Sequence, residues 1–144
     1  ARLSRKEQEE VKSIMIQFDT APADHQPSLF QRLGDLMEKA DAYEPLPHEN
    51  EEIDYQPALF RSVWADTVKL RQTGFFVEQA KHIRCPVVAI HGEHDPHPAE
   101  GVEKPLSPVL HDFRMIQLKH CGHTPWYERQ AKGQFLDILN KELA

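Results

Sequence analysis

Hydrophobic residues recur every three or four positions along the first half of the chain, which is the spacing of one face of an α-helix. The pattern predicts three amphipathic helices, over residues 4–18, over residues 27–40, and from residue 57 to a stop at Gly74. Between the second and third helices, residues 44–54 contain two prolines and five carboxylates and have no apolar period. We expect this segment to be a solvated loop and an internal boundary of the chain.

The hydrophobic pattern changes in the second half of the chain. Residues 85–90 form a short β-rich run whose apolar positions do not alternate, as in a parallel strand that is covered on both faces. A second strand is predicted over residues 113–118, and residues 105–111 can supply the helix that crosses between two parallel strands. Residues 126–143 predict a terminal amphipathic helix. The order is three helices followed by β-α-β-α, an α/β arrangement.

Two parallel strands are too few to form an independent sheet. The apolar run at residues 87–90 therefore demands neighbouring strands, which must come from elsewhere. The chain begins with Ala rather than Met. We expect that it is part of a longer protein, or that it pairs its strands with another copy in a strand-swapped homo-oligomer.

The composition narrows the class of protein. The 144 residues are 40% hydrophobic and 28% charged, as in one soluble globular domain. Lys and Arg total 17 against 23 Asp and Glu, and the net charge of −6 opposes binding to nucleic acid. The longest apolar run, residues 87–90, is far too short to span a membrane. The two cysteines imply no disulfide framework, so we expect a cytoplasmic protein without a nucleic-acid or membrane partner.

Residues that can do chemistry gather in the loops after the two predicted strands. Residues 91–98 follow the first strand and residues 119–126 follow the second. The carboxyl ends of parallel strands form one edge of a sheet, where sites collect. Because neighbouring strands are about 4.8 Å apart, we expect Asp95 and His123 to lie within contact range there. A carboxylate so placed orients an imidazole and stabilises the imidazolium that it becomes as a general base.

These loops resemble those after the last two strands of the α/β-hydrolase fold. The resemblance lies in residues 86–95, Pro-Val-Val-Ala-Ile-His-Gly-Glu-His-Asp, and in Cys121-Gly122-His123 followed by a terminal helix. In that family the triad acid stands three residues after a Gly that follows the penultimate strand, and the catalytic His follows a Gly after the last strand. The resemblance implies that Asp95 is the acid and His123 the catalytic base.

The resemblance also implies a division of the chain. Residues 1–56 correspond to a helical cap and residues 57–144 to the C-terminal part of the hydrolase core. The family's nucleophile elbow, Gly-x-Ser-x-Gly, is missing, because the required glycines flank none of the five serines: Ser4, Ser13, Ser28, Ser62 and Ser107. We therefore expect this chain to be the C-terminal fragment of a serine hydrolase and to be inactive by itself. The N-terminal half of the same enzyme would complete the Ser-Asp-His triad.

The reaction that the resemblance implies is hydrolysis of an ester or amide bond in a small-molecule substrate, without a cofactor. The same fold also supports lyase and peroxidase chemistry, so the reaction class rests on the fold. The alternative is a non-catalytic structural or binding module that self-associates through an exposed strand edge. The missing nucleophile favours this alternative, and the retained Asp95 and His123 oppose it.

Further residues are weaker candidates for a site. His94 and His97 are expected near the mouth of the substrate site. Trp64 either lines a pocket below the cap or, as its helical spacing favours, packs in the core. Cys85 and Cys121 are expected to be small buried apolar groups rather than nucleophiles.

A metal site is the competing interpretation of the histidines. His91, His94 and His97 are spaced by three, which suggests a set of metal ligands. Pro96 and Pro98 prevent the helix that would bring the three rings onto one face. We therefore predict no metal site from this spacing.

Overall fold

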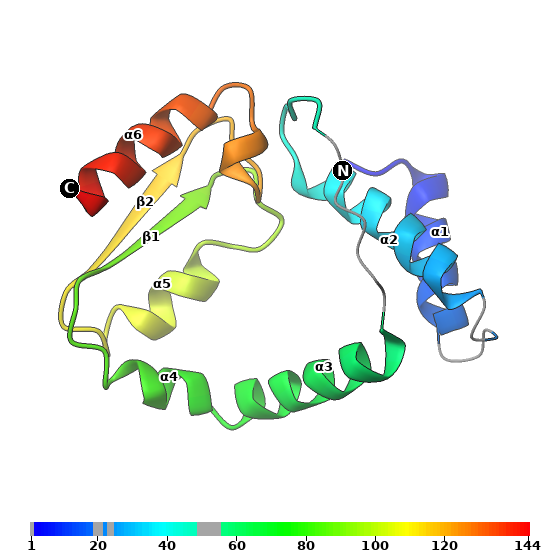
Figure 1. Ribbon diagram of the computed structural model, residues 1–144, viewed down its shortest axis with the longest axis horizontal. Coiled ribbons are helices and arrows are strands. Elements are labelled where there is room, and N and C mark those ends of the chain that lie inside the picture. The colour runs from blue at the N-terminus through cyan, green and yellow to red at the C-terminus, as the bar shows by residue number, and fades with distance from the viewer. Residues whose placement is uncertain (1, 19–21, 23–24, 49–55) are drawn as a thin grey trace.

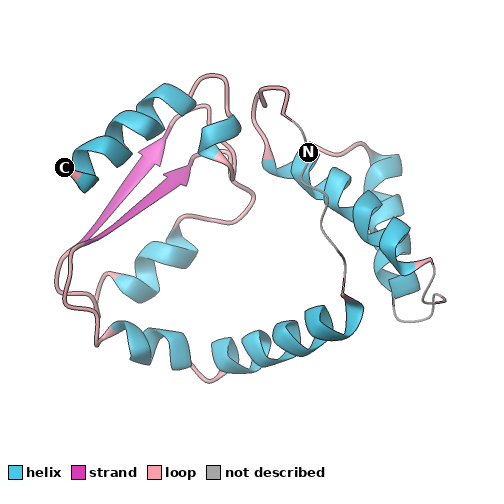
Figure 2. Ribbon diagram, viewed as in Figure 1, coloured by secondary structure: helices cyan, strands magenta, loops and turns pink. Residues whose placement is uncertain are grey.

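The computed structural model describes residues 2–18, 22, 25–48 and 56–144, and these form a mixed α/β structure that is mostly helical (Figures 1 and 2). The elements in chain order are α1 (Arg5–Phe18), α2 (Gln26–Asp41), α3 (Pro57–Gln72), α4 (Phe75–Ala80), β1 (Val87–Gly92), α5 (Glu100–Leu106), β2 (Phe113–Leu118), the 3-10 turn η1 (Pro125–Tyr127) and α6 (Lys132–Leu143). The three predicted N-terminal helices and both predicted strands are confirmed, although the first strand begins at Val87 rather than at residue 85.

Helices α1 and α2 lie side by side at the N-terminal end of the chain (Figure 1). Their apolar stripes face each other, and Ile14 and Leu36 are buried. Ser4 and Glu7 form a capping box, because the Glu7 amide donates to Ser4 Oγ at 3.3 Å and the Ser4 amide donates to Glu7 Oε2 at 2.8 Å. The start of α1 is therefore determined by its own sequence.

Strands β1 and β2 pair in parallel, with Val87 opposite Phe113 and Gly92 opposite Leu118. The two strands end level with each other, so the loops that follow them leave the sheet side by side. Helix α6 packs on the sheet over a small core of fully buried residues, namely Leu118, Cys121 and Ala131. The strand β1 is only half-buried, because within the described residues the sheet has two strands.

Two predictions for the helices of the second half are corrected. Helix α5 occupies Glu100–Leu106 rather than residues 105–111, because acidic side chains in its first turn favour the start at Glu100 and Pro108 follows its end. The terminal helix begins at Lys132 rather than at residue 126. The chain forms the short turn η1 and then becomes extended at Glu128, with φ −88° and ψ 128°.

The end of α3 follows the sequence prediction. Gly74 has φ 72°, the left-handed conformation that glycine adopts without steric cost after the last turn of a helix. The short helix α4 begins directly after it. Gly74 therefore separates two helices where the sequence pattern predicts only a stop.

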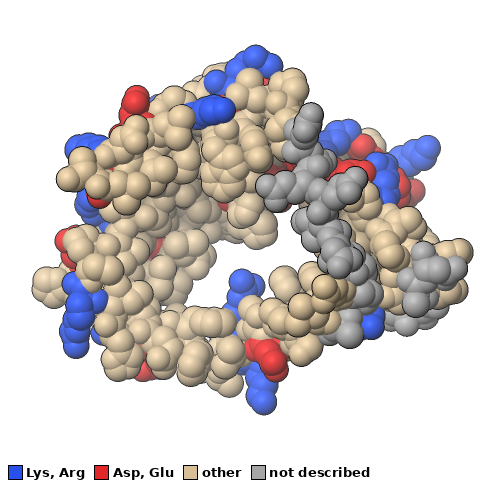
Figure 3. Space-filling model, viewed as in Figure 1, with Lys and Arg blue, Asp and Glu red and all other residues tan. Residues whose placement is uncertain are grey.

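Helix α3 lies across an opening from the loops at the ends of the strands (Figures 1 and 3). Phe60 contacts Phe30 of α2, with ring centroids 5.6 Å apart. Trp64 stacks on Phe60 at 6.2 Å and is 55% exposed. The prediction of a core position for Trp64 is therefore wrong, because the described residues leave this face of α3 largely uncovered.

The proposed boundary near residue 56 stays a prediction. Residues 49–54 of the predicted solvated loop lie outside the described residues. Pro45, at the beginning of that loop, forms an isolated antiparallel bridge with Glu128. Among the described helices, none combines the length and the apolar character needed to cross a membrane.

Candidate functional site

Backbone hydrogen bonds join the loops that follow β1 and β2. The His94 amide donates to the Cys121 carbonyl at 2.8 Å. The first loop turns back at once, since the Asp95 amide donates to the Gly92 carbonyl at 3.2 Å. The loop that carries Asp95 is thus fixed beside the loop that carries His123.

Gly92 permits this close approach of the two loops. A Cβ atom at this position would fall on the carbonyl oxygens of Gly122 and Cys121. Those oxygens belong to the backbone and cannot rotate away as a flexible side chain would. The juxtaposition of the two loops therefore requires glycine at the end of β1.

Gly92→Ala is expected to lower the free energy of unfolding by about 1–3 kcal/mol or more, because the two loops must move apart to accommodate the methyl group. The matched control is Gly34→Ala in α2. Gly34 has nothing within 4 Å of its Cβ position, so alanine there should stabilise the helix by up to about 1 kcal/mol. Urea denaturation followed by circular dichroism measures both changes. Equal effects of the two substitutions would contradict the close packing of the loops.

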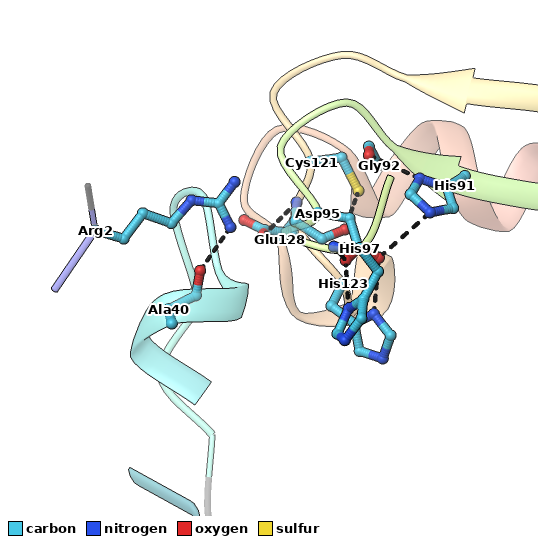
Figure 4. A network of polar contacts seen from close by, with 10 residues as sticks. Arg2, Ala40, His91, Gly92, Asp95, His97, Cys121, His123 and Glu128 are labelled. Carbon is cyan, nitrogen blue, oxygen red and sulfur yellow. Dashed lines mark hydrogen bonds and ion pairs between the residues drawn. The ribbon is translucent and has the colours of Figure 1, made fainter. Parts of the chain in front are cut away.

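Asp95 and His123 are in direct contact, as the sequence predicts (Figure 4). Nδ1 of His123 donates to Oδ2 of Asp95 at 2.7 Å. The side chain of Asp95 is 6% exposed and that of His123 is 51% exposed. One nitrogen of the imidazole is thus held by a nearly buried carboxylate, and the rest of the ring remains accessible from solvent.

His97 binds the second oxygen of the same carboxylate. Oδ1 of Asp95 accepts from the His97 amide at 2.8 Å and from His97 Nδ1 at 2.9 Å. Burial alone would raise the pKa of Asp95, but the hydrogen bonds from the His97 amide and from the His123 and His97 rings outweigh it and lower this pKa. An ionised carboxylate only accepts hydrogen bonds, so Nδ1 of each imidazole carries the proton.

A third histidine borders the carboxylate. Nδ1 of His91 contacts the Gly92 carbonyl at 2.9 Å, and its Nε2 lies 3.7 Å from Oδ2 of Asp95. His94, in contrast, packs its ring against Tyr43, with centroids 4.4 Å apart. The three regularly spaced histidines are therefore not brought together as one set of ligands.

The remaining predicted site residues have different surroundings. Nδ1 of His94 is buried and has no hydrogen-bond partner in the described part of the chain. Trp64 lies on α3, which is remote from the strand ends in Figure 1. The structure therefore brings His97 to Asp95 and His123 but leaves Trp64 away from them.

The two cysteines differ from each other. Cys121 is buried, as predicted, and burial raises the pKa of its thiol to about 11, with a contribution from the Glu128 and Asp95 charges. The thiol therefore stays protonated at neutral pH, which is unfavourable for a nucleophile. Cys85 is exposed, so the prediction of burial is wrong for it. It lies ahead of β1, where the chain has not yet entered the sheet.

The Glu128 side chain connects the His123 loop to the residues that follow α2. The residue is 1% exposed, and its carboxylate accepts three backbone hydrogen bonds, from Tyr43 at 2.7 Å and from Glu44 and Gly122 at 2.8 Å each. Because two of these amides follow α2 and the third precedes His123, one carboxylate connects the N-terminal helices to the site.

The sequence pattern does not single out Glu128, although it contains a signal. Glu128 stands three residues before Ala131 and seven before Phe135, on the apolar stripe of the predicted terminal helix. A carboxylate on such a stripe needs a buried partner. That partner is the backbone of residues 43–44 and 122, which no local pattern identifies.

The end of α2 also contacts the His123 loop directly. The His123 amide donates to the Asp41 carbonyl at 2.8 Å. A Cβ atom on Gly122 would fall on the same Asp41 oxygen. Glycine before His123 therefore lets the loop approach the end of α2 as closely as it does.

Comparison with known proteins shows a similarity in structure but none in sequence. No known family matches the sequence, and no curated protein is similar to it. Among solved structures, the crystal structure of VinJ is similar, with a TM-score of 0.46 and 12% sequence identity over 95% of this chain and 53% of the VinJ chain. The chain thus spans about half the length of that structure.

Proposed function

We propose that this chain supplies the acid and the histidine of a Ser-Asp-His triad in an enzyme of the α/β-hydrolase type. His123 is the general base and Asp95 is the residue that orients it. The observation that carries the proposal is the 2.7 Å hydrogen bond between His123 Nδ1 and Asp95 Oδ2 at the ends of two parallel strands. In this proposal residues 1–56 are the cap and residues 57–144 are the C-terminal part of the core.

The hydrogen bond fixes the tautomer that catalysis needs. With the proton on Nδ1, the Nε2 atom of His123 has a lone pair and can take a proton from a hydroxyl nucleophile. The ionised Asp95 then stabilises the imidazolium, which returns the proton to the leaving group of an ester or amide. General acid–base catalysis of this kind contributes about 10²- to 10⁴-fold to a rate.

The nucleophile has to come from residues beyond this sequence. All five serines lie in the described part of the chain, and none of them has a hydrogen bond to His123 there. The proposed partner is the N-terminal half of the same enzyme, which in this fold carries the Gly-x-Ser-x-Gly elbow. The proposed substrate is a small molecule, and no cofactor is needed for the reaction.

Labelling with a fluorophosphonate probe tests the proposal. The full-length protein in which this sequence occurs is expected to label at a serine outside these 144 residues, and His123→Gln should slow labelling by about 10²- to 10⁴-fold. The 144-residue chain by itself should not label. Modification at any of its five serines, or failure of a full-length protein with a serine elbow to label, would count against the proposal.

A second candidate function is self-association without catalysis. It is favoured by the half-buried strands of a two-stranded sheet and by exposed apolar side chains on one face of α3, namely Leu59, Phe60, Val63 and Trp64. Failure of the full-length protein to label would favour this candidate.

A further inference from the structure

Asp95, His97 and His123 form a cluster with the composition of a metal site. Each residue offers one ligand atom, and the three atoms all lie within 4.8 Å of one another. Figure 4 shows both rings pointing toward the one carboxylate. We propose that this cluster binds a divalent transition-metal ion, with Zn²⁺ as the best match, through two imidazoles and one carboxylate.

The distances fit a small rearrangement around an ion. Zn²⁺ binds His nitrogen and carboxylate oxygen at about 2.0–2.2 Å in tetrahedral geometry, which places neighbouring ligand atoms about 3.4 Å apart. In the structure His123 Nδ1 lies 2.7 Å from Oδ2 of Asp95, and His97 Nδ1 lies 2.9 Å from Oδ1 of the same carboxylate. Because the three ligand atoms all lie within 4.8 Å of one another, an ion that binds one atom from each residue needs each pair of atoms to move by less than about 1.5 Å.

The carboxylate is preorganised, whereas the imidazoles are accessible. The side chain of Asp95 is 6% exposed, and the His97 amide donates a hydrogen bond of 2.8 Å to its Oδ1. The side chains of His97 and His123 are 69% and 51% exposed. An ion can reach the cluster from solvent, and water can take the remaining coordination position.

Proton balance does not oppose the binding. Without an ion, Nδ1 of each imidazole carries a proton and donates a hydrogen bond to the carboxylate of Asp95. When the ion binds, each ring shifts to the other tautomer, so the proton moves to Nε2 and the Nδ1 lone pair becomes available to the metal. The two Nδ1–H···O hydrogen bonds are replaced by two metal–nitrogen bonds and one metal–oxygen bond, and no proton is released.

The donor set and the surrounding charge select the kind of ion. Two imidazoles and a carboxylate suit Zn²⁺, Cu²⁺ or Ni²⁺, whereas Mg²⁺ and Ca²⁺ prefer oxygen ligands alone. The carboxyl group of Asp41, at the end of α2, also interacts electrostatically with His123 and His97. A second acidic group beside the two rings favours a cation over an anion at this position.

This site is distinct from the histidine spacing in the sequence. Pro96 and Pro98 do prevent a helix from aligning His91, His94 and His97. The ligands proposed here come from two loops instead, and the Asp-Pro-His turn places His97 beside Asp95. The inference does not rest on the proposed hydrolase function, but the two exclude each other in time. A bound ion takes Nδ1 of His123, which Asp95 must orient, and leaves the proton on Nε2, which then cannot act as the base.

Calorimetric titration of the chelator-treated full chain with ZnCl₂ tests the inference. One ion per chain is expected, and excess Mg²⁺ should not compete. His97→Gln should raise Kd by at least about 10- to 100-fold, since loss of even an outer partner of a ligand has an effect of that size. His82→Gln and His111→Gln are the matched controls, because both histidines are exposed and outside the cluster, and they should leave Kd unchanged.

Co²⁺ provides a second readout that does not depend on any enzyme activity. The wild-type chain should show the strong d–d absorption of tetrahedral, four-coordinate Co²⁺. The His97→Gln and Asp95→Asn variants should lose this absorption. The inference is overturned if no saturable binding occurs, or if His97→Gln binds Zn²⁺ as well as the wild type, which would mean adventitious binding to surface imidazoles. Failure of fluorophosphonate labelling would leave these two readouts unaffected.

Discussion

Asp95→Asn in the full-length protein is expected to lower kcat for a p-nitrophenyl ester by about 10³- to 10⁴-fold, with a much smaller change in KM. The amide introduced there has no charge to stabilise the imidazolium of His123. Its NH₂ group, if turned toward Nδ1, also favours the tautomer with the proton on Nε2, which cannot act as the base. The substitution removes an interaction that is made in the transition state and not with the bound substrate, so it lowers kcat and changes KM little.

Asp137→Asn is the matched control for this substitution. Asp137 is exposed on α6, so its substitution makes the same carboxylate-to-amide change outside the two loops. Its kcat should equal that of the wild type. An Asp95→Asn protein that stays folded by circular dichroism and keeps kcat within a few-fold of the wild type would remove Asp95 from the proposed mechanism.

The contact between Asp95 and His123 follows from features that a sequence contains. The apolar runs predict both strands, and the crossover between them predicts a parallel pair. The level ends of the strands, Gly92 opposite Leu118, then bring the two loops together. The predicted helices at the N-terminal end are confirmed for the same reason, because their periodicity and the Ser4 capping box are local signals.

The position of His97 beside Asp95 follows from a local feature of the sequence, the spacing of two residues between an aspartate and the next histidine. An aspartate often accepts a hydrogen bond from the backbone amide two residues later. Asp95 does so with His97, and the turn also brings the His97 ring to the same oxygen. The expectation that His97 lies near the site therefore has a physical cause beyond its position in the loop.

The features that the sequence pattern misses depend on contacts between distant parts of the chain. The hydrophobic periodicity predicts a terminal helix from residue 126. In the structure Glu128 lies before the helix in extended backbone, and its carboxylate accepts hydrogen bonds from amides that follow α2. Trp64 has the spacing of a core residue, yet it is exposed because α3 has few described neighbours. Spacing shows which side chains share a face and does not show what covers that face.

Glu128→Ala is expected to be among the most destabilising substitutions in the chain, with a loss of about 3 kcal/mol or more in the free energy of unfolding. It leaves three backbone amides without their acceptor, two after α2 and one at Gly122. An unsatisfied buried donor costs about 1–3 kcal/mol. The total free energy of unfolding of a native protein is only about 5–15 kcal/mol. Urea denaturation should therefore show a large decrease in the midpoint of unfolding.

Two further variants separate the hydrogen bonds of Glu128 from its charge. Glu128→Gln keeps one carbonyl oxygen but turns an NH₂ group toward backbone donors, so its stability should fall between those of Glu128→Ala and the wild type. Glu142→Ala removes a carboxylate that pairs with Arg114 at the surface, and exposed ion pairs contribute little. If Glu128→Ala were as stable as Glu142→Ala, the three hydrogen bonds would not hold the His123 loop against α2. Because that loop carries the ring that contacts Asp95, Glu128→Ala should also weaken Zn²⁺ binding, although Glu128 lies outside the cluster of ligands.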